Sequence, residues 1–135
     1  GAGGMFGAVL TRSGIGEAMT GRLDALGIPL LLAAFLIAVV MRVAQGSATV
    51  AATTAAGFIA PAVEAGGHSP FQLALTVLAV AAGSIVLSHV NDSGFWLVRG
   101  FLRLDTATML RTWTVQATAV GALAFAGTCL LYLLS

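Results

Sequence analysis

The sequence predicts an all-α membrane protein, a bundle of helices. Of its 135 residues, 59% are hydrophobic and 8% are charged, whereas soluble domains carry about 25% charged residues. The mean hydropathy is +1.01, and apolar runs of helical length recur along the chain. Polar clusters interrupt these runs twice, at 45–49 and at 88–93. We therefore expect helices that lie in a bilayer and are interrupted inside it at two places.

The composition narrows the range of functions. The net charge of +1 is too small to indicate binding to nucleic acid. The single cysteine, Cys129, excludes a disulfide framework, and no cofactor or metal site is expected. The chain starts "GAGGMFGAVL", without an initiating methionine or a charged signal-peptide region. We therefore expect residues 1–135 to be the C-terminal piece of a larger protein.

The first apolar helices are expected before residue 61. Residues 1–10 are apolar and glycine-rich, and 11–27 are polar enough for a short amphipathic helix at the surface. An apolar helix over 28–43 starts near Pro29, a favourable first-turn position. After the polar break, a second short run, 48–60, stops at Pro61. Each half is shorter than the about 20 residues of a full span, so the two form either a re-entrant hairpin or one long broken helix.

The second half of the chain contains longer apolar runs. Residues 61–70 are expected to form a loop, because they hold two prolines and two glycines. The run from 71 to 90 is long enough to span, is interrupted by "SHVNDSGFW" and resumes until 104; the last span is 112–134. Trp96 and Trp113 are expected at the membrane interface. The spacings Ala79/Gly83 and Ala117/Gly121 predict close helix packing.

The two polar breaks predict a binding site. Unpaired backbone survives at membrane depth only where it is buried in protein or lines a wet cavity. Ser47 is placed to cap a helix beginning at residue 48, and Asn91, Asp92 or Ser93 to cap one near Gly94. Two helix N-termini would then face one site, where their partial positive charges favour an anion. Together with a nearby arginine and several polar side chains, this arrangement suits a carboxylate ligand with a hydroxylated body.

At these residues the sequence resembles a known family. The stretch "GSATVAATTAAG" together with "SHVNDSGFW" resembles the gluconate permease family of proton-coupled sugar-acid symporters. The resemblance covers nearly the whole chain and implies a fold of the ion-transporter superfamily, with two inverted repeats that each contain a hairpin and a broken helix. It implies that 28–60 is a re-entrant hairpin with its tip at 45–48, that 71–104 is a transmembrane helix unwound at 88–93, and that 112–134 is the final transmembrane helix. The chain would be the second repeat, incomplete at its N-terminus.

The resemblance implies proton-coupled uptake of gluconate or a related sugar acid across the bacterial inner membrane by a multi-pass protein. The proton carrier would be Asp92 or His89, with Asp92 preferred because burial raises the pKa of a carboxyl group. The expected partners are the sugar acid, the proton, the lipid bilayer and the missing part of the same transporter. A homodimer is also allowed, since dimers are usual in that superfamily. The expected substrate-binding residues are Arg42, Gln45, Gly46, Ser47, Thr49, Ser88, Asn91 and Ser93.

Three alternatives stay open at this point. Arg42 either points into the site or extends to the interface as a snorkelling side chain. An intramembrane hydrolase would use Ser88, His89 and Asp92, although adjacent residues rarely converge on a shared hydrogen bond. A structural bundle without transport activity would have no need for two polar breaks. Finally, the arginines at 99, 103 and 111 favour a cytoplasmic location for that loop.

Overall fold

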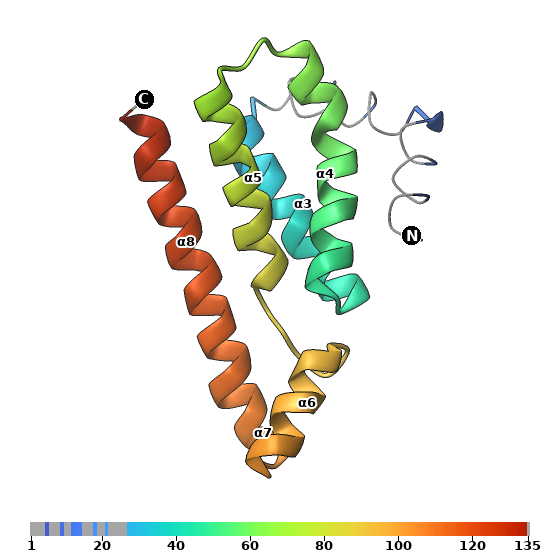
Figure 1. Ribbon diagram of the computed structural model, residues 1–135, viewed down its shortest axis with the longest axis vertical. Coiled ribbons are helices and arrows are strands. Elements are labelled where there is room, and N and C mark those ends of the chain that lie inside the picture. Colours follow the sequence, from blue (N-terminus) through green and yellow to red (C-terminus); the bar gives the residue numbers. More distant parts are fainter. Residues whose placement is uncertain are drawn as a thin grey trace.

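Figure 1 shows a computed structural model of the chain, which describes residues 5, 9, 12–14, 18, 21 and 27–134. The amphipathic helix predicted within 11–27 and the glycine-rich start lie mostly outside the described residues. The described part contains helices and no strand. The chain is an all-α membrane protein, as the sequence predicts.

The helices run alternately up and down the long axis of the molecule. In Figure 1, α3 (Leu30–Gln45) descends, α4 (Ala48–Ala65) returns beside it, and α5 (Pro70–Ile85) descends again. After a break at 86–92, α6 (Ser93–Leu102) continues downward. The chain then turns into α7 (Thr106–Met109), a π-helical turn η1 (Leu110–Thr114) and α8 (Val115–Leu133), which ascends along α5.

The segment around 28–60 folds as a helical hairpin, and a single long helix is excluded. α3 ends at Gln45 because Gly46 adopts a left-handed conformation, with φ of 76°, which glycine accepts without strain. Ser47 then caps α4 by accepting a hydrogen bond from the Val50 backbone N–H. The predicted tip at 45–48 is therefore confirmed.

The predicted end of the second hairpin helix at Pro61 is wrong. α4 continues through Pro61 to Ala65, so the loop expected at 61–70 shrinks to 66–69. A proline inside a membrane helix is tolerated where neighbouring helices and small adjustments satisfy the freed carbonyl.

The broken helix is also confirmed, with a longer break than expected. α5 begins in a capping box formed by Ser69 and Gln72 and ends at Ile85, and α6 begins at Ser93. The unwound segment is therefore 86–92, compared with the predicted 88–93. Within it Leu87 has a positive φ of 55°, which is unfavourable for a bulky side chain.

The final helix starts six residues earlier than predicted. Asp105 caps it by accepting hydrogen bonds from the Thr108 backbone N–H, at 2.9 Å, and hydroxyl, at 2.6 Å. The hydroxyl of Thr108 lowers the pKa of this exposed carboxyl group. Helix then continues from Thr106 to Leu133. Among the described residues, this helix and α4 are the two that are long and apolar enough to cross a membrane.

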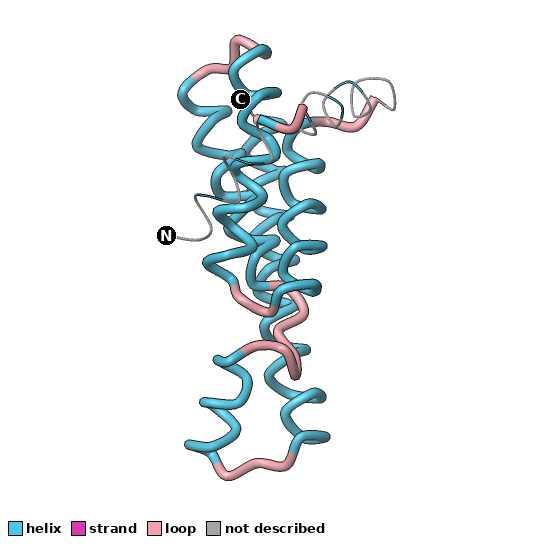
Figure 2. The backbone as a smooth tube through the Cα atoms, turned by 90° about the vertical axis from the view of Figure 1, so that its right-hand side faces the viewer, coloured by secondary structure: helices cyan, strands magenta, loops and turns pink. Residues whose placement is uncertain are grey.

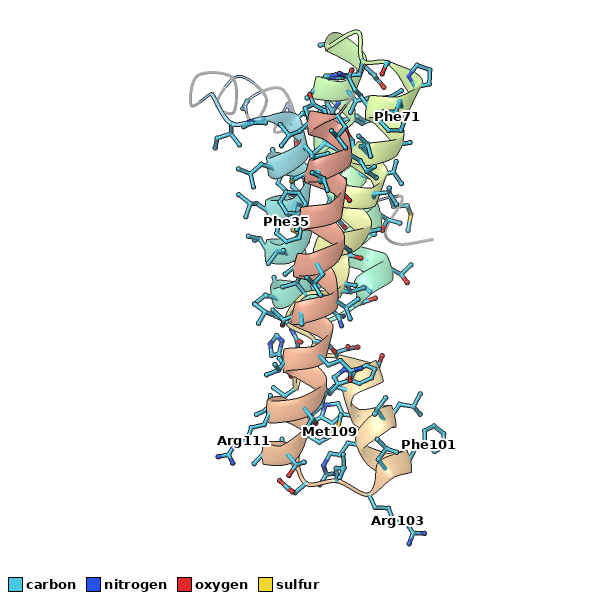
Figure 3. All side chains as sticks on the ribbon, turned by 90° about the vertical axis from the view of Figure 1, so that its left-hand side faces the viewer. Phe35, Phe71, Phe101, Arg103, Met109 and Arg111 are labelled. Carbon is cyan, nitrogen blue, oxygen red and sulfur yellow. The ribbon has the colours of Figure 1, made fainter. Side chains whose placement is uncertain are left out.

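Small residues allow the helices to pack closely. A Cβ added to Gly83 of α5 would lie 2.9 Å from the Cβ of Ala38 and nearer still to a carbonyl of α3. One added to Gly121 of α8 would lie 2.7 Å from the Ala82 carbonyl oxygen of α5. The close packing predicted from these glycine spacings is confirmed. Phe35 of α3, labelled in Figure 3, stacks on Phe125 of α8 with ring centroids 4.0 Å apart.

Candidate functional site

The hairpin tip and the break in the second helix lie in direct contact. In Figure 2 the two loops lie side by side, at the lower end of α3, α4 and α5. The amide of Asn91 donates to the Val43 carbonyl at 2.6 Å, a carbonyl that the end of α3 leaves without a helical partner. A Cβ on Gly46 would lie 2.6 Å from the Asn91 carbonyl carbon. The two polar clusters, about 45 residues apart in sequence, therefore form one junction.

Arg42 points into this junction. The residue is 4% exposed, and its guanidinium donates to the Gly46 carbonyl and forms an ion pair with Asp92. The arginine therefore joins the hairpin to the broken helix. The alternative in which Arg42 snorkels to the membrane surface is wrong for this structure.

On the side of the broken helix, Asp92 is the centre of the hydrogen-bond network. Besides Arg42, its carboxylate accepts hydrogen bonds from the Ser88 hydroxyl and from the Gly94 backbone N–H, the latter at 2.8 Å. Asp92 is also the residue that caps α6, so the same carboxylate balances a cation and closes a helix end. Asp92 is 8% exposed and Ser88 is 2% exposed, which makes this a buried polar cluster.

The other predicted binding residues surround the cluster without all entering it. Gln45 and Thr49 are exposed on either side of the tip, and Ser93 is exposed in the first turn of α6. Ser47 is partly buried and caps α4. The ring of His89 bonds to the Leu87 carbonyl at 2.6 Å, within the break.

Two helix N-termini meet at the junction. α4 begins at the hairpin tip and ascends, whereas α6 begins at the break and descends, so their first turns face each other in Figure 1. The first backbone N–H groups of a helix have no helical acceptor, and the helix dipole adds a partial positive charge there. With Arg42 between them, the junction has the chemistry of an anion site.

The last helix holds the break in place, and sequence reasoning missed this contribution. Trp113 Nε1 donates to the Ser88 hydroxyl at 2.8 Å, and the Thr114 hydroxyl donates to the Ser88 carbonyl at 2.5 Å. The Leu87 N–H donates to the Thr118 hydroxyl at 3.2 Å. The indole N–H of Trp113, a residue expected at the membrane interface, is thus bound inside the protein, and its location relative to a bilayer stays a prediction. Two pairs of threonines spaced four residues apart on this helix, 108/112 and 114/118, were the available signal.

These contacts fix the height of the junction along the final helix. Residues 113–118 lie about 10–18 Å along the final helix from its start at Thr106. The helix is about 42 Å long, and a bilayer core is about 30 Å thick. A helix centred in the bilayer therefore holds the junction several ångströms inside the apolar core, where an ionisable pair is costly and indicates function.

The geometry does not assemble a hydrolytic triad. The Ser88 hydroxyl bonds directly to Asp92, and the His89 ring bonds to a backbone carbonyl. A serine nucleophile needs a base within hydrogen-bond reach that is in turn oriented by a third group. This arrangement does not provide one.

Comparison with known proteins identifies the family. The model of the family described as GntP family permease matches residues 1–134. The chain belongs to the GntP permease family. This membership confirms the resemblance found in the sequence, and it places the chain among permeases rather than enzymes.

Several members of the GntP family are close relatives. The chain is 48% identical over 121 residues to the inner membrane permease YgbN of Escherichia coli strain K12, covering 90% of this chain and 26% of that protein. It is 45% identical to the low-affinity gluconate transporter of the same strain, covering 90% and 27%. Identity to the Gnt-II system L-idonate transporter is 42%, covering 93% and 28%. The chain thus spans about a quarter of the length of these relatives. No solved structure matches it.

Proposed function

We propose that this chain forms part of a secondary transporter that takes up gluconate or a related sugar acid together with a proton. The transporter would lie in the bacterial inner membrane as a multi-pass protein, and the hairpin of α3 and α4 would be re-entrant. The relatives named for gluconate and L-idonate support this substrate class. The rest of the transporter, which the longer relatives contain, would complete the site.

The buried ion pair between Arg42 and Asp92 carries the proposal. An arginine, two helix N-termini and a set of polar side chains are the groups that hold a hydroxylated carboxylate. In this structure Arg42 pairs with the carboxylate of Asp92, and a ligand carboxylate would bind to the same guanidinium. The substrate anion and Asp92 are therefore competitors for one cation.

This competition provides a physical route to proton coupling. A buried arginine without an anion is strongly unfavourable. When a proton neutralises Asp92, the guanidinium is free to pair with a substrate carboxylate. When proton and substrate leave, Asp92 takes back its place. The site thus holds one negative charge in both states, and binding of the anion favours binding of the proton.

Arg42 is the charged group that contacts Asp92. It reaches Asp92 from α3, while Ser88 contacts it from the break and Gly94 from α6. From the last helix, Trp113 contacts Ser88 in turn. His89, three residues before Asp92 in the chain, is the second titratable group in the break and the alternative carrier.

Replacing Asp92 by asparagine in the full-length transporter tests the proposal. Asparagine keeps the shape and mimics the neutral state, so we expect exchange of gluconate across proteoliposomes to persist and proton-driven accumulation to be lost. Asp105→Asn is the matched control, since Asp105 is exposed and the Thr108 hydroxyl lowers its pKa. Asp105 therefore stays ionised at two assay pH values on either side of neutrality, and its variant should accumulate substrate normally.

Each alternative gives a different result. Full accumulation by the Asp92→Asn variant, with loss in a parallel His89→Gln variant, assigns the proton to His89. If the wild-type protein exchanges no acid from a panel of gluconate, idonate and hexuronates, the transporter proposal fails and a structural bundle is favoured.

A further inference from the structure

A cavity opens beside the ion pair, on the side of the last helix. Its volume is about 260 Å³, and Arg42, Ser88, Trp113, Gln116 and Ala117 are among the residues that line it. This space would hold about eight water molecules, which is near the lower end of small-molecule sites. None of the lining residues from the last helix was expected at a binding site.

Arg42, which lines this cavity, has a hydrogen-bond donor that is not used. Arg42 is 4% exposed, and its two terminal nitrogens bond to Gly46 and Asp92. Its Nε is buried and has no hydrogen-bond partner among the described residues. A buried donor left without an acceptor is unfavourable by about 1–3 kcal/mol. A ligand oxygen in the adjoining cavity would satisfy it.

The last helix is locally distorted near the point where it lines the cavity. Residues Leu110–Thr114 form a π-helical turn, a feature that occurs mostly as a single turn and often at functional sites. This turn places Trp113 and Thr114, neighbours in sequence, so that both bond to Ser88. The indole is thus fixed at the cavity rather than free to rotate.

We propose that the last helix forms the specificity wall of the substrate site, with Gln116 and Trp113 binding the hydroxylated chain of the sugar acid. This inference rests on the transport function proposed above and deepens it. Arg42 Nε bonds an oxygen at the acid end. The Gln116 amide, with two donor hydrogens and an acceptor oxygen, bonds hydroxyl groups further along.

The aromatic and small residues complete the selectivity. The face of the Trp113 indole offers an apolar surface to the C–H groups of an extended sugar chain. Ala117 leaves the space that this chain needs. The wall therefore discriminates by length and hydroxylation, whereas Arg42 and the helix N-termini recognise the carboxylate that all sugar acids share.

Two matched pairs of variants in the full-length transporter test the wall. Ala117→Leu fills the cavity, and Ala119→Leu makes the same change at an exposed position outside it. Gln116→Leu removes the amide from an exposed residue, so the fold is preserved, and Thr112→Val is its control one turn earlier. Thr112 is exposed and bonds to the Thr108 carbonyl. Each variant is assayed by counterflow with gluconate and with glycerate, a shorter acid with fewer hydroxyl groups.

We expect Gln116→Leu to raise the KM for gluconate about five-fold, the effect of one hydrogen bond, and to leave the KM for glycerate unchanged. Ala117→Leu should raise the gluconate KM more than tenfold, while both controls stay within about two-fold of wild type. Wild-type exchange can be normal while Gln116→Leu leaves the KM for gluconate unchanged or changes the KM for both acids equally. That result would contradict the role of the last helix in specificity, but not the proposed transport function. If the wild-type protein exchanges neither acid, the proposed function itself fails, and this inference falls with it.

Discussion

Gly46 is the residue on which the contact between hairpin tip and broken helix depends most directly. Its φ of 76° lies in the left-handed region, and an added Cβ would meet the backbone of Asn91. Gly67, in the loop after α4, has a similar φ of 60° with open space around it. The two glycines therefore separate the effect of backbone conformation from that of close packing.

We predict that Gly46→Ala destabilises the full-length protein much more than Gly67→Ala. Both variants bear the left-handed penalty of about 1–2 kcal/mol. Gly46→Ala also forces the Asn91 backbone away, at about 1–3 kcal/mol more, and should reduce sugar-acid exchange. Thermal unfolding in detergent measures the difference. Equal losses of stability would show that the tip and the break are not in contact.

The polar site residues that interrupt apolar runs could be predicted from the sequence. The contributions of the largely apolar residues Leu87 and Trp113 could not. Arg42, Ser47 and Asp92 stand out in the sequence because charge and capping groups are rare at membrane depth. The positive φ of Leu87 and the bond from Trp113 to Ser88 depend on a partner about 25–30 residues away in the chain. Composition and periodicity contain no information on such a pairing.

At the scale of elements, the kind of each element was predicted better than its ends. The hairpin and the broken helix are present, because glycine, serine and aspartate at the breaks stop and restart helices by local rules. The ends at Pro61 and at residue 112 were wrong. In the first case neighbouring helices tolerate a proline, and in the second Asp105 caps a helix whose first turns are polar.

The packing of α8 on α5 gives an element-scale prediction with an internal control. A Cβ added to Gly121 would meet the Ala82 carbonyl oxygen and the side chain of Val86. A Cβ added to Gly127 would meet nothing within 4 Å. Gly121→Ala should therefore destabilise the protein by about 1–3 kcal/mol. Gly127→Ala should be neutral or stabilise by up to about 1 kcal/mol, because alanine favours the helix.

Unfolding of both variants in detergent measures this difference in stability. The exchange activity of the same variants tests the site. Because α8 and the π-helical turn η1 that precedes it position Thr118 and Trp113 against the break, Gly121→Ala should lower the rate of sugar-acid exchange as well as stability. A Gly121→Ala protein as stable and active as wild type would contradict the α5–α8 contact.

For the whole molecule, the two ends differ in charge. Arg103 and Arg111 extend from the end formed by α6 and α7, opposite the end that carries Phe71 (Figure 3). Arg99 lies at the same end in the last turn of α6. At the other end, among the described residues, the loop after α4 follows Glu64. Positive charge gathers on the cytoplasmic side of membrane proteins, so this asymmetry favours a cytoplasmic location for the end formed by α6 and α7.

We predict that the α6–α7 end is cytoplasmic and that the loop between α4 and α5 faces the opposite side. Arg103→Cys and Ala65→Cys, each in a full-length protein without other cysteines, report the two ends; Cys129 is replaced by alanine in this background. A membrane-impermeant thiol reagent added to intact cells should label Ala65→Cys alone, and added to inverted vesicles should label Arg103→Cys alone. α5 and α6 together would then cross the membrane once, with the junction of Arg42 and Asp92 inside it. Labelling of both positions from one side would contradict a broken helix that spans, and with it the membrane depth assigned to the junction.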